Sequence, residues 1–254
     1  LGCGGTVLAL APQAGGRIAR ILHAGVDWLA GYAPDRAATL SWGCFPMLPW
    51  AGRVRHGRFD FGGQSHQLPA TLGAHAIHGV GYAMPWRVEH HGASTAELSL
   101  ALPRDARWPF GGHARQSFRV REHVLELCLT LTAGRLPMPA ALGWHPWFVK
   151  PERLHFTPRA CYPRDAEGIA GLPPGAVPPP PWDDCFLATG PIVLERASQR
   201  LELSSDCGHW VVYDAPADTT CVEPQSAPPD AFNLGLAEVL APGATLTRWF
   251  RLAW

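Results

Sequence analysis

Proline and glycine recur so often along this sequence that no window keeps a helical repeat for three turns. The chain holds 27 glycines and 26 prolines among 254 residues, about a fifth of its length where ordinary proteins have roughly 12%. A disordered chain would lack large apolar side chains, but this one has 11 tryptophans and 10 phenylalanines. The prolines and glycines are therefore expected to punctuate the turns of a packed, all-β protein.

Alternation of apolar and polar residues supports this prediction, because it is typical of strands with one buried face. It is clearest over residues 124–132, where leucines at every second position share one face. Residues 58–61 and 64–68 flank Gly62-Gly63 and predict a hairpin, since glycine takes a positive φ at no steric cost. At most one short helical turn is expected, between Asp230 and Leu240, and the many short strands predict a β-sandwich. Further strands are expected at 5–10, 96–102, 192–197, 200–204, 209–214 and 245–253.

Residues 171–181, with six prolines in eleven positions, have the composition of a semi-rigid linker between domains. The segments on either side share the same β-like composition, so an extended surface loop is favoured instead. A chain of this length can form one large β-sandwich, and we predict a single domain over residues 1–254.

The charge balance and the cysteines exclude several classes of protein. Lys plus Arg and Asp plus Glu number 21 each, and this formal net charge of 0 gives no reason to expect a nucleic-acid partner. No apolar run approaches the roughly 18 residues that span a bilayer, and the first 30 residues carry no secretory signal, so no membrane association is expected. The seven cysteines are odd in number, scattered and never in a C-x-x-C pair, which argues against a disulfide framework and favours a cytoplasmic location. We expect a monomer and leave a dimer open; because the sequence opens at Leu1, it also leaves the native N-terminus open.

Four polar clusters lie among aromatic, proline and glycine residues, where partial burial would shift the pKa of an ionisable group. Each has an ordinary structural explanation when taken alone. Arg53 could be a solvated residue after a turn, His145 a core histidine between two tryptophans, and Glu223 an exposed acid at a strand end. His75 and His78 have a spacing that could suggest a metal, but no third ligand lies nearby in the sequence, so no metal is predicted.

As a set, these segments resemble the aldose 1-epimerase (galactose mutarotase-like) family, in the family's order and over nearly the whole chain. The resemblance implies a β-supersandwich with few or no helices, in agreement with the all-β prediction. The sequence departs from the family at Gly52, where asparagine is usual, and in its short length, and both departures leave the preferred sugar open. The segments that carry the resemblance are Ala14-Gly15-Gly16-Arg17-Ile18, PWAGRV (49–54), His78-Gly79, MPAALGWHPWF (138–148), DDCF (183–186) and CVEPQS (221–226).

The resemblance implies an isomerase, an aldose 1-epimerase (mutarotase) that interconverts the α and β anomers of a hexose such as galactose or glucose. This chemistry needs one acid and one base and no cofactor. By the resemblance, Glu223 is the base and His145 the acid. His78 is a second imidazole that hydrogen-bonds the sugar, while Arg53 and Asp183 bind its hydroxyl groups.

Three tryptophans adjoin these residues in the sequence and are candidates for a wall against the apolar face of a sugar. They are Trp144, Trp147 and Trp182. In a chain so rich in tryptophan, core packing is the more common role, and none of the three is included among the predicted site residues.

Three alternative functions stay open at this point. A hexose-6-phosphate 1-epimerase would need a basic cluster for the phosphate, for which Arg53, Arg55 and Arg58 are available. A catalytically silent sugar-binding module of the same fold is disfavoured, because the candidate acid and base are both retained. A glycoside hydrolase would need two carboxylates about 5 to 10 Å apart, and Asp183 and Glu223 could form such a pair.

Overall fold

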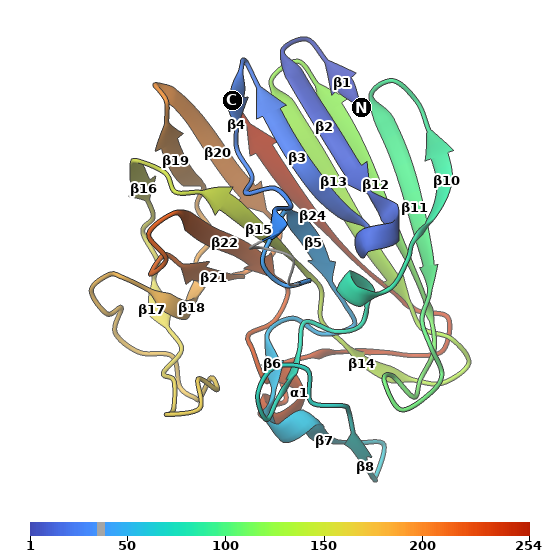
Figure 1. Ribbon diagram of the computed structural model, residues 1–254. Coiled ribbons are helices and arrows are strands. Elements are labelled where there is room, and N and C mark those ends of the chain that lie inside the picture. The colour runs from blue at the N-terminus through green and yellow to red at the C-terminus, as the bar shows by residue number, and fades with distance from the viewer. Residues whose placement is uncertain (35–38) are drawn as a thin grey trace.

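Two large antiparallel sheets dominate the computed structural model, which describes residues 1–34 and 39–254 (Figure 1). In pairing order, the ten-stranded sheet contains β1 (Gly2–Cys3), β2 (Thr6–Ala11), β3 (Arg17–His23), β5 (Cys44–Met47), β15 (Gly143–Val149), β22 (Thr219–Gln225), β21 (His209–Tyr213), β18 (Asp183–Leu187) and β17 (Ala160–Cys161), with β4 (Val26–Asp27) paired to β3. The eight-stranded sheet contains β10 (Arg87–His91), β11 (Thr95–Ala101), β12 (His113–Arg121), β13 (Val124–Thr132), β24 (Thr245–Ala253), β20 (Gln199–Ser205), β19 (Ile192–Arg196) and β16 (Arg153–His155).

The short strand pairs and the single α-helix gather at one end of the two sheets, at the bottom of Figure 1. The only α-helix in the described ranges is the single turn α1 (Ala231–Leu234), which lies where a short helical turn was expected. The all-β prediction is thus confirmed. The two-stranded pairs are β14 (Met138–Ala140) with β23 (Glu238–Leu240), β6 (Arg53–Val54) with β9 (Ala76–Ile77), and β7 (Arg58–Phe61) with β8 (Gln64–Gln67); the 3-10 turns are η1 (Pro12–Ala14), η3 (Arg55–Gly57) and η4 (Gly81–Ala83).

The predicted strands lie within one or two residues of the observed ones, because their alternation is a local property of the chain. In β13 the leucines at 125, 127, 129 and 131 are buried, and the residues between them are half-buried. The hairpin between β7 and β8 turns at Gly62 and Gly63, whose φ angles are +59° and +76°. The proline-rich segment 171–181 is a loop between β17 and β18, in which Gly175 pairs with Cys161 through two backbone hydrogen bonds of 2.8 and 3.0 Å.

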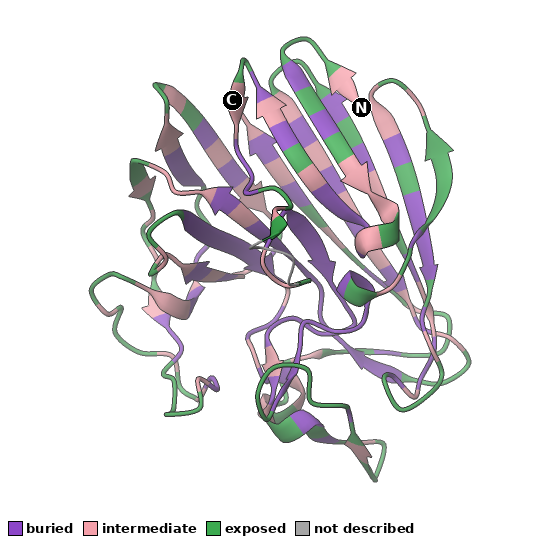
Figure 2. Cartoon of the chain, viewed as in Figure 1, coloured by how far each residue is buried: buried purple, intermediate pink, exposed green. Residues whose placement is uncertain are grey.

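Three central strands of the ten-stranded sheet differ from the rest because they are covered on both faces. Every residue of β5 and β22 is buried, as is most of β15, and Figure 2 shows β5 and β22 purple along their length. Trp144 of β15 and Val222 of β22 belong to the main core. Because side chains alternate along a strand, the residues next to them point to the opposite face.

The remaining sequence expectations about the fold concern cysteines and membranes. All seven cysteines lie in the described part of the chain and are free, so the expectation that they form no disulfide framework is confirmed. Within residues 1–34 and 39–254, no helix is both long and apolar enough to cross a bilayer.

Candidate active site

The five residues predicted to act on a sugar line one cavity of about 370 Å³, although they come from five different segments. His145 lies on β15, Glu223 on β22 and Asp183 on β18, while Arg53 starts β6 and His78 follows β9. The two histidines and the glutamate are buried and form the floor of the cavity; Arg53 and Asp183 are half-buried and form its rim. The volume falls in the range of small-molecule sites, about 300 to 1,000 Å³.

His145 and Glu223 are in direct contact because of the register between their strands. Gly143 pairs with Gln225 and Trp147 with Cys221, which places His145 opposite Glu223. The distance from His145 Nε2 to Glu223 Oε1 is 3.2 Å, and the two side chains are 8% and 4% exposed. The site therefore holds an imidazole and a carboxyl group within 3.2 Å of each other, away from bulk water.

Burial shifts the pKa values of this pair in opposite directions. It raises the pKa of the Glu223 carboxyl well above its usual value and lowers the pKa of His145 to about 3. Both shifts favour the neutral form of the group. The pair is thus expected to hold one proton, as a carboxyl beside a neutral imidazole, and transfer of that proton over the 3.2 Å contact gives a carboxylate beside an imidazolium.

Stacking, rather than a hydrogen bond, fixes the orientation of the His145 ring. Phe45, which pairs with His145 across β5, stacks on one side at a centroid distance of 4.7 Å, and Trp147 stacks at 5.3 Å. His145 Nδ1 is buried and has no hydrogen-bond partner among the described residues. The ring therefore has no hydrogen-bond partner at Nδ1 among the described residues, and its Nε2 faces Glu223.

His78 is held in one tautomer by the backbone of Gly52. The Gly52 amide donates a hydrogen bond of 3.2 Å to His78 Nδ1. Because this nitrogen accepts, the neutral ring carries its proton on Nε2, and burial lowers the pKa of His78 well below its usual value, which keeps the ring neutral. His78 lies edge-on to His145 at a centroid distance of 4.9 Å. It therefore presents a fixed N–H donor beside the acid–base pair.

Gly52, where the sequence departs from the family's usual asparagine, has a steric reason in this chain. Its φ is +70°, and a Cβ atom there would lie only 2.7 Å from Cβ of Pro229. A side chain at this position is disfavoured, and the residue acts through its backbone: the amide donates to His78 Nδ1, and the carbonyl accepts a hydrogen bond of 3.0 Å from the His78 amide.

His78, His145 and Glu223 also satisfy the distances of a metal site, since one donor atom of each lies within 4.8 Å of the others. The sequence had suggested a different pair, but His75 Nδ1 accepts a hydrogen bond of 3.0 Å from a backbone amide instead. A metal would need the lone pair of His78 Nε2, which carries the proton in the tautomer that Gly52 selects. The donor set therefore fits a metal poorly.

The rim residues differ in how they are paired. The guanidinium group of Arg53 has no hydrogen-bond or ion-pair partner within the described ranges, so it is available to a ligand. Asp183 Oδ2, by contrast, lies 3.0 Å from Nη1 of Arg164, a residue that the sequence did not indicate.

Gln225 is a second site residue that was not predicted. Its Nε2 donates a hydrogen bond of 3.0 Å to Glu223 Oε2, and its Oε1 is buried without a partner in the described part of the chain. The signal was present in the sequence, because residues two apart on a strand share a face. Gln225 thus hydrogen-bonds Oε2 of Glu223, whereas Oε1 faces His145.

Of the three tryptophans considered from the sequence, one lines the cavity. This is Trp147, which also lies against Tyr213 at a centroid distance of 6.2 Å. Trp144 is fully buried in the core, and Trp182 packs against Phe186.

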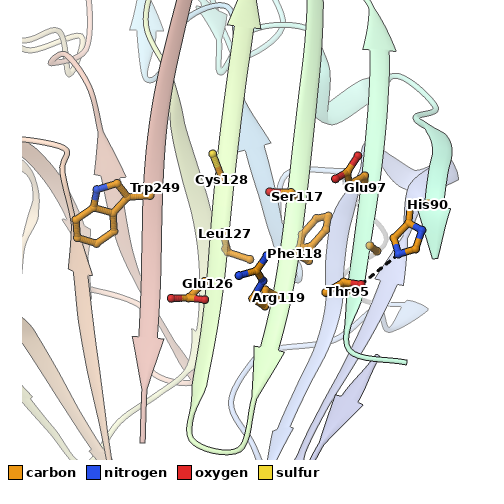
Figure 3. Close-up of a pocket in the computed structure, with 11 residues that line it drawn as sticks. His90, Thr95, Glu97, Ser117, Phe118, Arg119, Glu126, Leu127, Cys128 and Trp249 are labelled. Carbon is orange, nitrogen blue, oxygen red and sulfur yellow. Dashed lines mark hydrogen bonds between the residues drawn. The ribbon is translucent and has the colours of Figure 1, made fainter. Parts of the chain in front are cut away.

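A second hollow of about 380 Å³ lies on the outer face of the eight-stranded sheet (Figure 3). Its charged residues, among them Glu97, Arg119 and Glu126, are exposed or half-buried. Glu126 is paired with Arg121 at 3.2 Å. With no buried titratable group among its lining residues, this hollow lacks the desolvated acid–base pair of the first cavity.

Comparisons with known proteins show the family and the fold. The family model described as aldose 1-epimerase matches residues 2–158, a range that includes Arg53, His78 and His145. A galactose mutarotase-like protein from Clostridium acetobutylicum has a TM-score of 0.90 at 16% identity, covering 99% of this chain and 93% of that one. Galactose 1-epimerase from Lactobacillus acidophilus NCFM has a TM-score of 0.83 at 18% identity, covering 100% and 92%. The Escherichia coli K12 protein YphB, named as uncharacterized, is 32% identical over 109 residues, which is 41% of this chain but only 36% of YphB. The structural likeness confirms the predicted β-supersandwich.

Proposed function

The chain belongs to the aldose 1-epimerase family, and from this premise we propose that it is a mutarotase that interconverts the α and β anomers of a hexose such as galactose or glucose. The contact of 3.2 Å between His145 Nε2 and Glu223 Oε1 carries the proposal. Anomerisation moves protons on two oxygens that are bound to the same carbon, so its acid and base must be neighbours. A buried imidazole–carboxyl pair on the floor of a sugar-sized cavity meets this requirement.

In the first half of the proposed reaction, Glu223 takes the proton of the C1 hydroxyl while His145 gives a proton to the ring oxygen. The bond between C1 and the ring oxygen breaks, a C1=O bond forms, and the ring opens to an aldehyde. Rotation about C1–C2 presents the other face of the carbonyl. The hydroxyl then attacks, His145 takes its proton back, Glu223 returns the other, and the opposite anomer is formed with no net change in the enzyme.

The remaining site residues have supporting roles in this proposal. The Nε2–H group of His78 donates a hydrogen bond to a sugar oxygen. Because burial keeps this ring neutral, His78 does not transfer a proton. Arg53 donates to sugar hydroxyls and Asp183 accepts from them. Trp147 offers an apolar face beside the catalytic imidazole.

The basic residues near the cavity favour a neutral sugar over a sugar phosphate. The guanidinium group of Arg55 lies 2.7 Å from Asp165 and 3.4 Å from Glu167, so its charge is already compensated. Arg58 is exposed and does not line the cavity. Of the three arginines considered for a phosphate, Arg53 alone faces the cavity without a partner among the described residues.

The test is the rate at which freshly dissolved α-D-glucose, α-D-galactose and L-arabinose approach rotational equilibrium, corrected for the spontaneous reaction. We expect acceleration, and a loss of at least about 100-fold in Glu223→Gln, because general acid–base catalysis contributes roughly 10²- to 10⁴-fold. Glu97→Gln is the matched control, since it removes an exposed carboxylate from the second hollow (Figure 3) and should leave the rate unchanged.

No acceleration of any free sugar by folded protein would overturn the proposal. Acceleration of sugar phosphates alone would then favour the hexose-6-phosphate 1-epimerase. Sugar binding without turnover would favour the silent sugar-binding module, and release of sugar from a glycoside would favour the hydrolase.

A further inference from the structure

Residues 162–171, called the strap below, follow β17, contact Asp183 of the cavity rim and pair with Arg55, two residues after the other rim residue, Arg53. They were not part of any motif in the sequence. Their contacts join the segment that carries Arg53 to the strand that carries Asp183, and so connect two groups that are 130 positions apart in the chain.

The turn at residues 165–169 of the strap is held beside Arg53. Asp165 Oδ1 accepts hydrogen bonds of 3.0 Å from the amides of Glu167 and Ile169, which closes a tight turn. Asp165 Oδ2 accepts a hydrogen bond of 2.7 Å from Nη2 of Arg55, which lies two residues after Arg53. The turn at 165–169 is thus tied to the same short segment that presents the free guanidinium.

Arg164, the residue just before this turn, fastens the strap to Asp183. The Nη1 atom of Arg164 lies 3.0 Å from Asp183 Oδ2 and 3.8 Å from Asp184 Oδ1. The Arg164 side chain is 28% exposed, less than the 45% of Asp183. Because Arg164 pairs with Oδ2, the other carboxylate oxygen of Asp183, Oδ1, has no partner among the described residues.

Within the turn, Gly168 lies beside the guanidinium groups of Arg164 and Arg53. A Cβ atom at Gly168 would be 3.0 Å from Nη2 of Arg164 and 3.6 Å from Cζ of Arg53. The φ of Gly168 is +75°, a value that side chains disfavour. A side chain at Gly168 would therefore meet both arginines, so the strap passes next to the rim with backbone alone at this position.

We propose that Arg164 is a positioning residue for sugar binding: it holds Asp183 Oδ2 so that Oδ1 faces the sugar, and through the strap it fixes the separation of Asp183 from Arg53. The proposal rests on the proposed function, because it assigns Arg164 to the same cavity. Arg164 acts through Asp183 and takes no part in proton transfer, so its loss should weaken binding and spare the chemical step.

The experiment is a double-mutant cycle on the best sugar of the mutarotation assay. Arg164→Gln is expected to raise KM about three- to fivefold with kcat within twofold, since partly exposed ion pairs contribute up to about fivefold in an equilibrium constant. In an Asp183→Asn background, Arg164→Gln should have no further effect on KM. Arg164→Lys should restore part of the affinity, because it keeps the charge but not the planar fork.

Arg159→Gln is the matched control, because it removes an exposed arginine just before the strap that has no side-chain partner in the described ranges. Its KM should equal that of the wild type. An unchanged KM in Arg164→Gln, a fall in kcat alone, or a full effect of Arg164→Gln in the Asp183→Asn background would each overturn the proposal.

Sugar binding is measured in parallel by titration of tryptophan fluorescence, for which Trp147 lies in the cavity. A wild type that neither turns over nor binds any sugar overturns the proposed function and this inference with it. A wild type that binds without turnover leaves the same cycle to be run on Kd, with the same expected ratios. An active wild type with an additive cycle overturns the inference alone.

Discussion

Replacement of Gly52 by alanine tests two features of the backbone at this position: its close approach to Pro229 and its hydrogen bond to His78. The residue has a φ of +70°, and the added Cβ would lie 2.7 to 2.8 Å from three atoms of Pro229, one of them Cα. Two of these atoms belong to a rigid ring and one to the backbone, so the contact cannot be relieved by a rotamer change. The local backbone must move, and the amide that donates to His78 Nδ1 moves with it.

The cost has three parts. A left-handed conformation costs an alanine roughly 1 to 2 kcal/mol, overpacking about 1 to 3 kcal/mol, and loss of the hydrogen bond to His78 about 0.5 to 1.5 kcal/mol. Partial relief makes these terms less than additive, and we expect Gly52→Ala to lose about 3 to 4 kcal/mol of unfolding free energy. For a chain of this size that corresponds to a fall in Tm of about 6 to 16 °C.

Gly63→Ala is the matched control for the conformational term. Its φ is +76°, close to that of Gly52, but nothing lies within 4 Å of the Cβ position. Thermal unfolding followed by circular dichroism should therefore show a fall of only about 1 to 2 kcal/mol for Gly63→Ala. Equal destabilisation by the two substitutions would refute the steric argument at Gly52, and an unchanged KM in Gly52→Ala would refute its connection to His78.

Three further outcomes are expected. Gln225→Leu removes a hydrogen bond that lowers the pKa of Glu223, so this pKa should rise further and the acidic limb of the kcat profile should move to higher pH; an unmoved limb would contradict this assignment. His145 has a lowered pKa of about 3 and Glu223 a raised one, so the native pair holds one proton whereas the unfolded pair holds two below about pH 4.5, and wild-type stability in urea should fall from there toward pH 3. The fall should be shallower in His145→Asn, and parallel curves would show that this imidazole is not buried in the neutral form. His78→Asn should retain weak activity by polarimetry, whereas His145→Asn should lose most of it; equal losses would contradict the distinction drawn between the two histidines.

The strands were predictable from sequence because alternation is written into neighbouring residues, as in β13. The same alternation could not reveal the site, since β22 is buried on both faces and a glutamate within it looks like an exposed acid at a strand end. The cover over that face comes from β6, β9 and the loops around them, which are remote in the chain. The five site residues were predicted from the family resemblance, which rests on several motifs in a fixed order; no local pattern in the sequence indicated that they lie together.

Two contacts lay outside the reach of the sequence for different reasons. Gln225 shares a face with Glu223, so period-two spacing would have found it once Glu223 was placed on a strand. Arg164 precedes Asp183 across a long proline-rich loop, and only the folded geometry shows that the two side chains meet. The role of Gly52 likewise depends on Pro229, far along the chain.

The acid–base pair lies on central strands that are covered on both faces, whereas the residues of the rim belong to a short edge pair, a loop and a strand near the sheet margin. Central strands open to solvent only when the whole molecule unfolds, while loops open locally at little cost. We therefore expect the amide hydrogens at His145 and Glu223 to exchange with deuterium last, and those of the strap among the first. Under the proposed function, such a division would let mutation alter which sugar is held without disturbing the two groups proposed to move the protons, so that one scaffold could acquire new specificities by substitutions in its least stable parts.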